Sequence, residues 1–396
     1  MSQTLHMALW GFMLTFVVAL THYYLWARLV RDPVLPQPWW ALATALLVIL
    51  ALVTPLSMVL GRFVGGPWTA PLVWVSFLWM GVAFFVLLGV GSADLLRLGS
   101  KIWASSGEVA QDPARRLFFS RVVGGGAAAA ATLLGAVSVR AALAGARVAR
   151  VEVTLGRLPA SMDGITLVQI SDLHVGPTIG RFDVKALVRK VNGLNPDLVV
   201  ITGDLVDGSV AELAAAVAPL AELTSRWGTF FVTGNHEYYS GVAPWIAHLP
   251  SLGIRVLRNE RVFIADPADP DAGFYLAGVN DPTGRLLSGD GGSDVAAACR
   301  DCEDEREIIL LAHQPKAIHA AAAAKVGLVL AGHTHGGQIW PFGYLVRLTQ
   351  PYMAGLYRHD PHTQIYVNRG TGYWGPPMRL GSTSEITQMT VRSARV

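Results

Sequence analysis

Residues 165–174 read ITLVQISDLH, an apolar run rich in β-branched residues that is followed at once by Asp172 and His174. A short run of this kind predicts a strand buried on both faces of a sheet. The pattern recurs, because several apolar runs end in loops that carry Asp, Asn or His. These runs lie at residues 165–170, 197–202, 229–233, 274–279, 307–312 and 327–331. With helices expected at 184–191 and 211–223, and later strands at 363–368 and 385–391, the sequence predicts an α/β sandwich.

The polar residues lie where the predicted strands end, which is where ligands bind in α/β sheets. In an extended backbone, residues i and i+2 point the same way. Asp172 with His174, and His333 with His335, are therefore each expected to direct two side chains to one place. One such fragment alone is typical of an ordinary loop or helix cap, but five in order favour a functional site.

The set is too large for one metal ion and predicts two ions bridged by a carboxylate. Its four imidazoles suit Mn, Fe or Zn better than Ca or Mg. The candidate ligands are Asp172, His174, Asp204, Asn235, His313, His333 and His335.

These fragments resemble the motifs of a known family, the calcineurin-like metallophosphoesterases. The resemblance covers roughly residues 151–391, and the tail resembles the bacterial membrane-associated branch. It implies a calcineurin-like α/β sandwich of two mixed sheets flanked by helices. The fragments are DLH (172–174), GDLVD (203–207), GNHE (234–237), His313 and GHTHGGQ (332–338), and in the tail GLY (355–357), NRG (368–370), PMR (377–379) and EI (385–386).

The resemblance also implies roles for single residues. Asp172, His174 and His335 would bind one ion. Asn235, His313 and His333 would bind the other, and Asp204 would bridge both. His236 would face the substrate, and either protonate the leaving oxygen or stabilise charge on the phosphoryl group, with Asp207 orienting it. A metal-bound hydroxide would be the nucleophile.

One position departs from the family pattern. Gly208 stands where the family's protein phosphatases carry an arginine, which argues against a protein phosphatase and weakens the role of Asp207. We therefore expect a phosphodiesterase or phosphomonoesterase. The alternative is a non-catalytic metal-bearing scaffold or sensor domain. The net charge of +3 and the lack of a basic stripe argue against nucleic acid as a partner.

The first 150 residues have the composition of a membrane domain. Three stretches, 7–26, 39–60 and 70–90, are each near the length that crosses a bilayer and carry almost no charge. A fourth, 122–139, is rich in Gly and Ala and reads as a span, as a helix packed on the others through small residues, or as a signal segment. We expect a multi-pass membrane domain at 1–148, and a phosphoesterase domain at 149–396.

Arginines set the expected orientation, because cytoplasmic loops are enriched in Lys and Arg. The first and third loops carry most of them, which places the phosphoesterase domain on the extracytoplasmic side of the cell membrane. The string RRLFFSR (115–121) resembles a twin-arginine export signal, although a helix anchor at the cytoplasmic face explains it as well. A tether of about a dozen residues would hold the domain near the bilayer and favour lipid-linked or envelope phosphate esters as substrates.

Three further features lie in or near the predicted phosphoesterase motifs or in the loops between them. Glu237 is expected to pack or cap near its motif rather than act in the reaction. Cys299 and Cys302 are expected to be a structural pair or two free thiols, close to the end of a helix that begins near Asp294. Tyr373 and Trp374 are expected either to line the substrate mouth or to pack in a Gly/Pro-rich turn.

Overall fold

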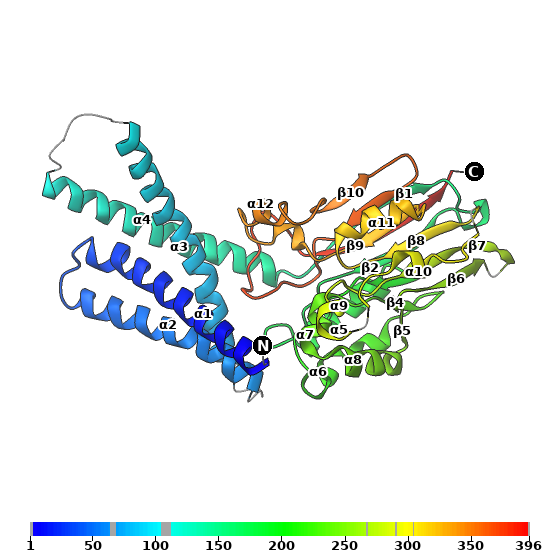
Figure 1. Cartoon of the computed structure of the whole chain (residues 1–396), viewed down its shortest axis with the longest axis horizontal. Coiled ribbons are helices and arrows are strands. Elements are labelled where there is room, and N and C mark those ends of the chain that lie inside the picture. Colours follow the sequence, from blue (N-terminus) through cyan, green and yellow to red (C-terminus); the bar gives the residue numbers. More distant parts are fainter. Residues whose placement is uncertain are drawn as a thin grey trace. The chain divides into compact units, whose positions relative to one another are not determined.

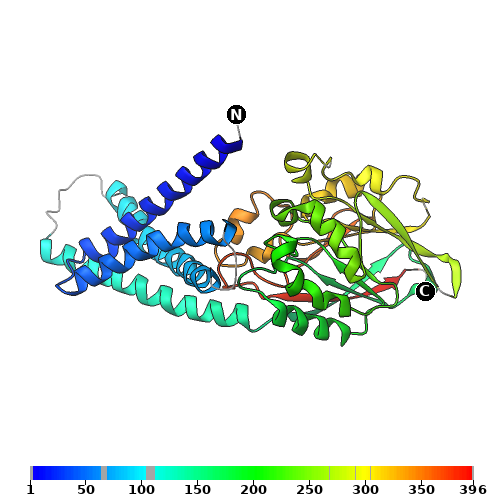
Figure 2. The ribbon, with the colours of Figure 1, turned by 90° about the horizontal axis from the view of Figure 1, so that it is seen from below.

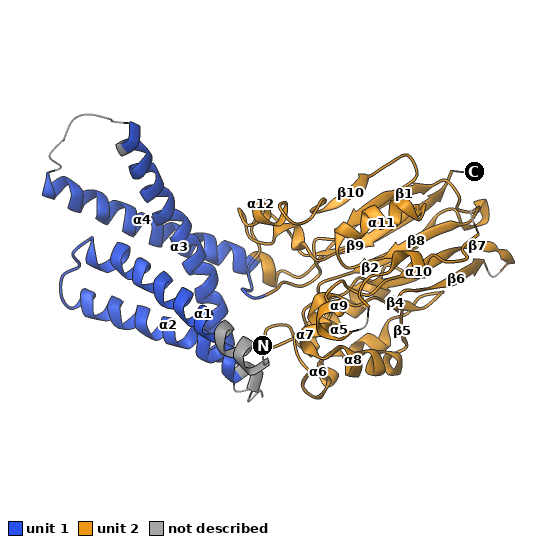
Figure 3. Cartoon of the chain, in the orientation of Figure 1, with its two compact units in different colours: residues 1–140, 375–378 blue, residues 141–374, 379–396 orange. Residues whose placement is uncertain are grey.

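The computed structural model describes residues 3–63, 69–103, 112–266, 268–289, 291–303 and 305–394. The chain divides into two compact units (Figure 3). The first contains residues 1–140 together with the short segment 375–378, and the second contains residues 141–374 and 379–396. This unit boundary lies before the domain boundary expected at 148/149, and that expected division stays a prediction.

The first unit contains the helices α1 (Gln3–Trp26), α2 (Trp39–Phe63) and α3 (Ala70–Trp103) and most of α4 (Pro113–Leu143). Within the described residues, four helices are long and apolar enough to cross a membrane. The last of them is longer than its apolar run, since it also takes in the stretch around Arg115 and Arg116. The qualifying windows are Gly11–Arg31, Trp39–Leu60, Ala70–Ser100 and Pro113–Leu143.

Polar contacts join three of these helices at one end of the helical unit. Arg28, just after α1, forms an ion pair of 2.8 Å with Asp94 near the end of α3. Arg121, in the early turns of α4, donates from Nε to the Pro33 carbonyl at 3.0 Å. The loop after α1, the end of α3 and the start of α4 therefore share one end, as alternating membrane crossings require.

The second unit is built on two six-stranded sheets (Figure 1). The first has the strand order β1-β12-β2-β3-β4-β5, and the second has the order β10-β11-β9-β8-β7-β6. Their strands are β1 (Arg147–Leu155), β2 (Ile165–Ile170), β3 (Leu198–Ile201), β4 (Thr229–Phe231), β5 (Ile254–Val256), β6 (Glu260–Asp266), β7 (Asp269–Gly278), β8 (Glu307–Leu311), β9 (Leu328–Ala331), β10 (Gly355–Arg358), β11 (Gln364–Val367) and β12 (Glu385–Ser393).

Both sheets are mixed, which confirms the predicted fold class. In the first sheet β2 to β5 run parallel, while the C-terminal strand β12 pairs parallel with β1 and antiparallel with β2. Strand β12 is red in Figure 2. In the second sheet β7, β8, β9 and β11 run parallel, and β6 and β10 pair antiparallel at the two edges. The carboxyl ends of the central parallel strands of each sheet thus meet at one edge, where the polar loops begin.

Apolar side chains fill three layers of the second unit. One core lies between the sheets, with Leu167 and Leu198 from one sheet and Leu276 and Ile309 from the other. A second core lies under helices of the first sheet, and a third lies under helices of the second sheet. The helices of this unit are α5 (Arg181–Asn192), α6 (Val210–Val217), α7 (Asn235–Ser240), α8 (Val242–His248), α9 (Gly284–Leu287), α10 (Val295–Ala298), α11 (Ile318–Ala323) and α12 (Gly343–Val346).

Two expected boundaries were wrong. The helix predicted at 211–223 ends as an α-helix at Val217 and continues as a 3₁₀ turn, because Pro219 lacks the N–H that an α-helix needs. The tether expected to be about a dozen residues is only residues 144–146, since α4 runs on through Arg140-Ala-Ala-Leu143 and β1 begins at Arg147. Ala, Leu and Arg are strong helix formers, which explains the extension.

Candidate metal centre

Five loops at the strand ends bring the predicted ligands together. Asp172 and His174 follow β2, Asp204 follows β3, and Asn235 begins α7 after β4. His313 follows β8 in the other sheet. His333 and His335 follow β9 in the same sheet. All seven predicted ligands therefore come from the edge where the two sheets meet.

The backbone at these residues is left-handed rather than extended. The φ angles are 52° at Asp172 and His174, 50° at Asp204 and His335, and 70° at His333. The expectation that extended i and i+2 residues point the same way was therefore wrong, although the side chains do converge. Asp and His tolerate this region better than most residues, and such strained positions cluster at functional sites.

Close approach of the loops depends on two glycines. A Cβ atom on Gly332 would collide with Ser171 Oγ and Asp172 Oδ2. A Cβ atom on Gly234 would collide with the Asp204 carboxylate. A side chain at either position would push a candidate ligand away from the site.

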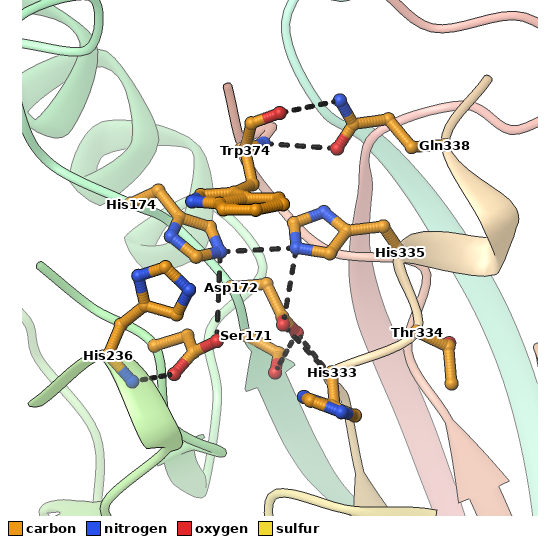
Figure 4. A network of polar contacts seen from close by, with 12 residues as sticks. Ser171, Asp172, His174, His236, His333, Thr334, His335, Gln338 and Trp374 are labelled. Carbon is orange, nitrogen blue, oxygen red and sulfur yellow. Dashed lines mark hydrogen bonds and ion pairs between the residues drawn. The ribbon is translucent and has the colours of Figure 1, made fainter. Parts of the chain in front are cut away.

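The first donor group contains Asp172, His174 and His335, whose ligand atoms lie close together (Figure 4). His174 Nε2 lies 3.1 Å from His335 Nε2. His335 Nε2 lies 3.5 Å from Asp172 Oδ1. Two ligands of one zinc-sized ion at ~2.1 Å are themselves roughly 3.0–3.4 Å apart, so these spacings fit donors around a single cation.

The second donor group contains Asp204, His313 and His333. His313 Nε2 lies 3.1 Å from Asp204 Oδ2 and 3.1 Å from His333 Nδ1. Asp204 Oδ2 also lies 3.8 Å from His174 Nε2 of the first group, while Asp204 Oδ1 accepts the backbone N–H of His236. One carboxylate oxygen of Asp204 is therefore turned toward both groups, as a bridging ligand requires.

The protonation of two histidines and of Asp204 suits divalent cations. Burial lowers the pKa of His333 to about 3 and that of His335 well below its ordinary value. Burial alone would raise the pKa of Asp204, but the neighbouring histidines, His313 first, hold it well below its ordinary value. At His313, burial alone would lower the pKa, but Asp204 raises it well above its ordinary value, so a cation would compete with a proton there. The buried Asn235 Oδ1 makes no hydrogen bond. Neutral imidazoles, a carboxylate and an unsatisfied carbonyl oxygen are the donors that a cation needs.

The contact made by one ring nitrogen of a histidine determines which nitrogen is left to face the other donors. His313 Nδ1 lies 2.7 Å from the Thr202 carbonyl, so it carries the proton, and Nε2 is left for the site. His174 Nδ1 lies 3.0 Å from Asp207 Oδ1. Burial alone would lower the pKa of His174, but the charge of Asp207 outweighs it and raises the pKa to about 9. A cation bound at Nε2 would compete with that second proton.

His236 lies beside these two donor groups and forms a third cluster with His174 and Asp207, whose ligand atoms also lie within 4.8 Å of one another. Its Nδ1 is 2.6 Å from the same Asp207 oxygen that contacts His174. Its ring stands at 90° to the His174 ring, with a centroid separation of 4.6 Å. The Asp207 carboxylate contacts His236 as expected, and it also contacts the predicted ligand His174, which the sequence did not indicate.

Glu237 has the capping position that the sequence favoured. Its buried carboxylate accepts backbone N–H groups of Asp204 at 3.0 Å, Leu205 at 2.8 Å and Gly234 at 2.6 Å. Burial raises the pKa of Glu237 to about 7. This side chain joins the loops after β3 and β4 and so positions Asp204 next to Asn235.

The two aromatic residues of the 371–376 turn have different environments. Tyr373 is buried, and its hydroxyl donates to the Thr178 carbonyl, so it packs in the core. Trp374 is half exposed, and its ring centroid lies 5.5 Å from that of His236. The Gln338 side chain donates to the Trp374 carbonyl at 2.9 Å and accepts its N–H at 3.0 Å. Trp374 is thus held next to His236, beside the donor groups (Figure 4).

Arg379 is a buried residue of the site region to which the sequence analysis gave no role. Its guanidinium donates to the carbonyls of Arg369 at 2.9 Å, Gly370 at 3.1 Å and His335 at 3.3 Å. Burial lowers its pKa to about 10. A planar group with five donors can hold several carbonyls in one place, so Arg379 fixes the loop that lies against His335. The only sequence signal was its place in the family-like tail.

Cys299 and Cys302 are free thiols. Helix α10 ends just before Cys299, and the Asp294 side chain caps it by accepting the N–H of Ala297, as expected. Burial raises the pKa of Cys299 to about 11 and also raises that of Cys302. The two thiols are therefore poor nucleophiles at neutral pH.

The fold and the site define an α/β sandwich with a group of metal-ligand residues at its strand ends. Comparison with known sequences agrees, because the family model for calcineurin-like phosphoesterase matches residues 165–337. A Danio rerio protein named "Transmembrane protein with metallophosphoesterase domain" is 37% identical over 382 residues, covering 94% of this chain and 86% of that one.

Two further relatives match a smaller share of the chain. A Bos taurus protein of the same name is 46% identical over 270 residues, covering 66% of this chain and 61% of that one. An uncharacterized metallophosphoesterase of Helicobacter pylori is 42% identical over 226 residues, covering 57% of this chain and 59% of that one. The chain belongs to the calcineurin-like phosphoesterase family, and the predicted family is confirmed. It is a membrane protein with a metallophosphoesterase domain.

Proposed function

We propose that this protein is a membrane-anchored, two-metal hydrolase of phosphodiesters or phosphomonoesters. The observation that carries the proposal is the pair of donor groups with Asp204 Oδ2 turned toward both, and with His236 beside them. A single structural ion would not require the second group, and a binding domain would not require an imidazole held next to the site by a carboxylate.

The roles follow from the geometry of each donor. Asp172, His174 and His335 would hold one cation. Asp204, His313 and His333, with Asn235 Oδ1, would hold the other, and Asp204 would bridge them. Two bound Mn, Fe or Zn ions would act as Lewis acids at the phosphoryl group and generate a nucleophilic oxygen at neutral pH.

His236 and Asp207 would handle the proton of the leaving group. Since His236 Nδ1 is turned to Asp207, the proton that His236 can give lies on Nε2. The Asp207 carboxylate fixes the orientation of the ring, so His236 is suited to protonate a leaving oxygen. This position is beside the ligands, where the ester bond would be broken.

Membrane attachment supports lipid-linked or envelope phosphate esters as the substrates. Only residues 144–146 separate α4 from β1, so the α/β unit begins directly after a helix that can cross the bilayer. Arginines 28, 31 and 121 lie at the shared end of α1, α3 and α4 described above, which supports a cytoplasmic location for that end. Helix α4 would then lead to an extracytoplasmic phosphoesterase domain.

The proposal is tested with the full-length chain purified in detergent. Hydrolysis of bis-p-nitrophenyl phosphate is measured with Mn²⁺, Fe²⁺ or Zn²⁺ for the wild type, for His236→Ala and for His319→Ala. His319 is an exposed imidazole outside the site and serves as the matched control. We expect metal-dependent hydrolysis that only His236→Ala reduces. Absence of hydrolysis with any metal or ester would instead favour the non-catalytic scaffold, and equal rates in all three chains would refute the role of His236.

A further inference from the structure

An exposed apolar segment begins five residues after His335. In the described part of residues 144–394, thirteen large apolar or aromatic side chains are exposed, and seven of them lie within residues 340–357. We call residues 340–348 the apolar loop. Its exposed side chains are Trp340, Phe342, Tyr344, Leu345 and Leu348, and Leu348 is 81% exposed. Soluble surfaces usually carry such side chains singly, and a concentration of them marks an interaction site.

Hydrogen bonds hold the chain on both sides of the apolar loop. Trp340 donates its N–H to the Leu380 carbonyl at 2.8 Å. After the loop, the Met353 carbonyl accepts a hydrogen bond of 2.6 Å from Thr334 Oγ1, and Thr334 lies between two predicted ligands. Helix α12, in the middle of the loop, has no buried residue. The apolar loop is therefore a well-anchored projection whose own side chains lack a core.

Its composition matches the interface of a lipid bilayer. Residues 332–358 contain no Asp or Glu, and their two formal positive charges are Arg347 and Arg358. Trp, Tyr and Phe have an apolar body and a polar or polarisable edge, and they concentrate where a bilayer meets water. Exposed apolar side chains with Arg among them are also typical of segments that lie in that interface and bind anionic lipids.

We propose that the apolar loop inserts into the headgroup–acyl boundary of the bilayer and holds the metal centre at the membrane surface. The occupant is the lipid bilayer, because this chain is a membrane protein and only residues 144–146 join α4 to β1. The positive charge of the loop complements anionic headgroups. Docking of a protein partner or of a second copy would not require this short connection between the α/β unit and a helix that can cross the bilayer.

The docking surface continues to the site itself. Gln338, two residues before the loop, holds the backbone of Trp374, and the Trp374 ring lies 5.5 Å from that of His236. A phosphate ester whose apolar part stays in the bilayer would thus contact aromatic side chains along the whole path from the apolar loop to His236. This consequence rests on the proposed function, and it names a membrane lipid ester as the substrate class.

The first test measures the depth of the loop without using activity. The full-length chain carries Cys299→Ser and Cys302→Ser, so that single cysteines can be labelled with a fluorescent NBD group at Leu348→Cys, or at the controls Phe182→Cys and Leu286→Cys. The controls are 88% and 85% exposed and lie outside the loop. Each chain is placed in nanodiscs of phosphatidylcholine with one third phosphatidylglycerol, with or without doxyl-labelled lipid.

We expect the doxyl lipid to quench the label at position 348 at least threefold more than the labels at 182 and 286. Equal quenching at the three positions would overturn the proposal. Energy transfer between labelled copies, without quenching by lipid, would also overturn it and would assign the surface to a second copy.

The second test separates the loop from the chemistry. Leu345→Asp with Leu348→Asp is compared with the wild type on bis-p-nitrophenyl phosphate in solution and on hexadecyl p-nitrophenyl phosphate in vesicles. We expect the rate on the vesicle-borne ester to fall about tenfold or more while the rate in solution is unchanged. If the variant hydrolyses each substrate as fast as the wild type does, the docking role is contradicted. If the wild type hydrolyses neither ester, the proposed function fails, whereas the quenching result still decides whether the loop enters the bilayer.

Discussion

Replacing His236 with Ala is expected to make hydrolysis strongly dependent on the leaving group. His236 is the imidazole that stands beside the donor groups, with its Nδ1 2.6 Å from Asp207 and its side chain 13% exposed. Among the described residues of the site, its Nε2 is the nitrogen best placed to give a proton to the departing oxygen. Without it, a basic leaving group must depart as an anion, whereas a weakly basic one such as p-nitrophenolate departs with little help.

The size of the effect follows from general acid catalysis. A positioned acid contributes about 10²–10⁴ in rate, which corresponds to roughly 3–5 kcal/mol of activation free energy. We expect His236→Ala to lose this factor on aryl esters with basic leaving groups, and a smaller factor of about tenfold on the p-nitrophenyl ester. Asp207→Asn keeps the shape of the side chain but removes the charge that His236 and His174 share. We expect it to lose about 10–100-fold, as is usual for residues that orient a catalytic or ligating group.

The assay is kcat/KM for a series of aryl phosphate esters, from p-nitrophenyl to p-methoxyphenyl, with metal content measured for each preparation. The wild type should show a shallow dependence on the basicity of the leaving group, and His236→Ala a steep one. Parallel lines for the two proteins at equal metal content would refute the assignment of His236 as the acid. In that case His236 would act equally on all esters, as a binding group does.

Three further outcomes are expected. Gly332→Ala should weaken metal binding about 10–100-fold in a metal titration, because the added Cβ would displace a candidate ligand. The control Gly156→Ala, where the added Cβ meets open space, should bind metal as the wild type does. Glu237→Ala should lower the thermal unfolding midpoint of the α/β unit by roughly 6–12 °C, because it removes the acceptor of three buried backbone N–H groups, which costs about 3 kcal/mol in total. An unchanged midpoint in a protease-resistance melt would contradict this. Alkylation of Cys299 at pH 8, followed by mass spectrometry, should be about 100-fold slower in the folded chain than in the unfolded chain. Burial raises the thiol pKa from 9.0 to about 11, which lowers the fraction of reactive thiolate at this pH, and equal rates would show that the thiol is not buried.

The sequence was sufficient to predict the central strands and the grouping of the candidate ligand residues. The run 165–170 is β2, and the runs before Asp204, His313 and His333 are β3, β8 and β9. Apolar runs buried on both faces are the clearest strand signal, and the loops after them carry the chemistry. The residues predicted to act together lie together, although their roles as ligands stay predictions.

Edge strands and backbone conformation were not predictable in the same way. Strand β1, with the sequence RVARVEVTL, alternates apolar and charged residues and is half exposed, while β5 has three residues. Such strands are defined by their pairing partners, which lie far away in the sequence. The left-handed conformations at Asp172 and His174 depend on contacts between loops of different strands. The rule that residues i and i+2 of an extended chain point the same way therefore predicted correctly that these side chains converge, although the backbone there is not extended.

Contacts between different loops of the site also could not be predicted from a single sequence. Arg379 holds the carbonyls of Gly370 and His335, and Gln338 holds the backbone of Trp374. Arg379 lies 44 residues from His335, and Gln338 lies 36 residues from Trp374, and neither pair shows a periodic pattern. The length of α4 was missed for a different reason, because its apolar run ends at Val139 while its helix-forming residues continue to Leu143.

Metal stoichiometry tests the central claim most directly. The full-length chain, purified in detergent and loaded with Mn²⁺ or Zn²⁺, is analysed by plasma mass spectrometry beside Asp204→Ala and the surface control His319→Ala. The two donor groups predict two ions per chain in the wild type and in the control, and less than one in Asp204→Ala, because both groups share that carboxylate. One ion or none in the wild type, or two ions retained in Asp204→Ala, would contradict a two-metal site bridged by Asp204.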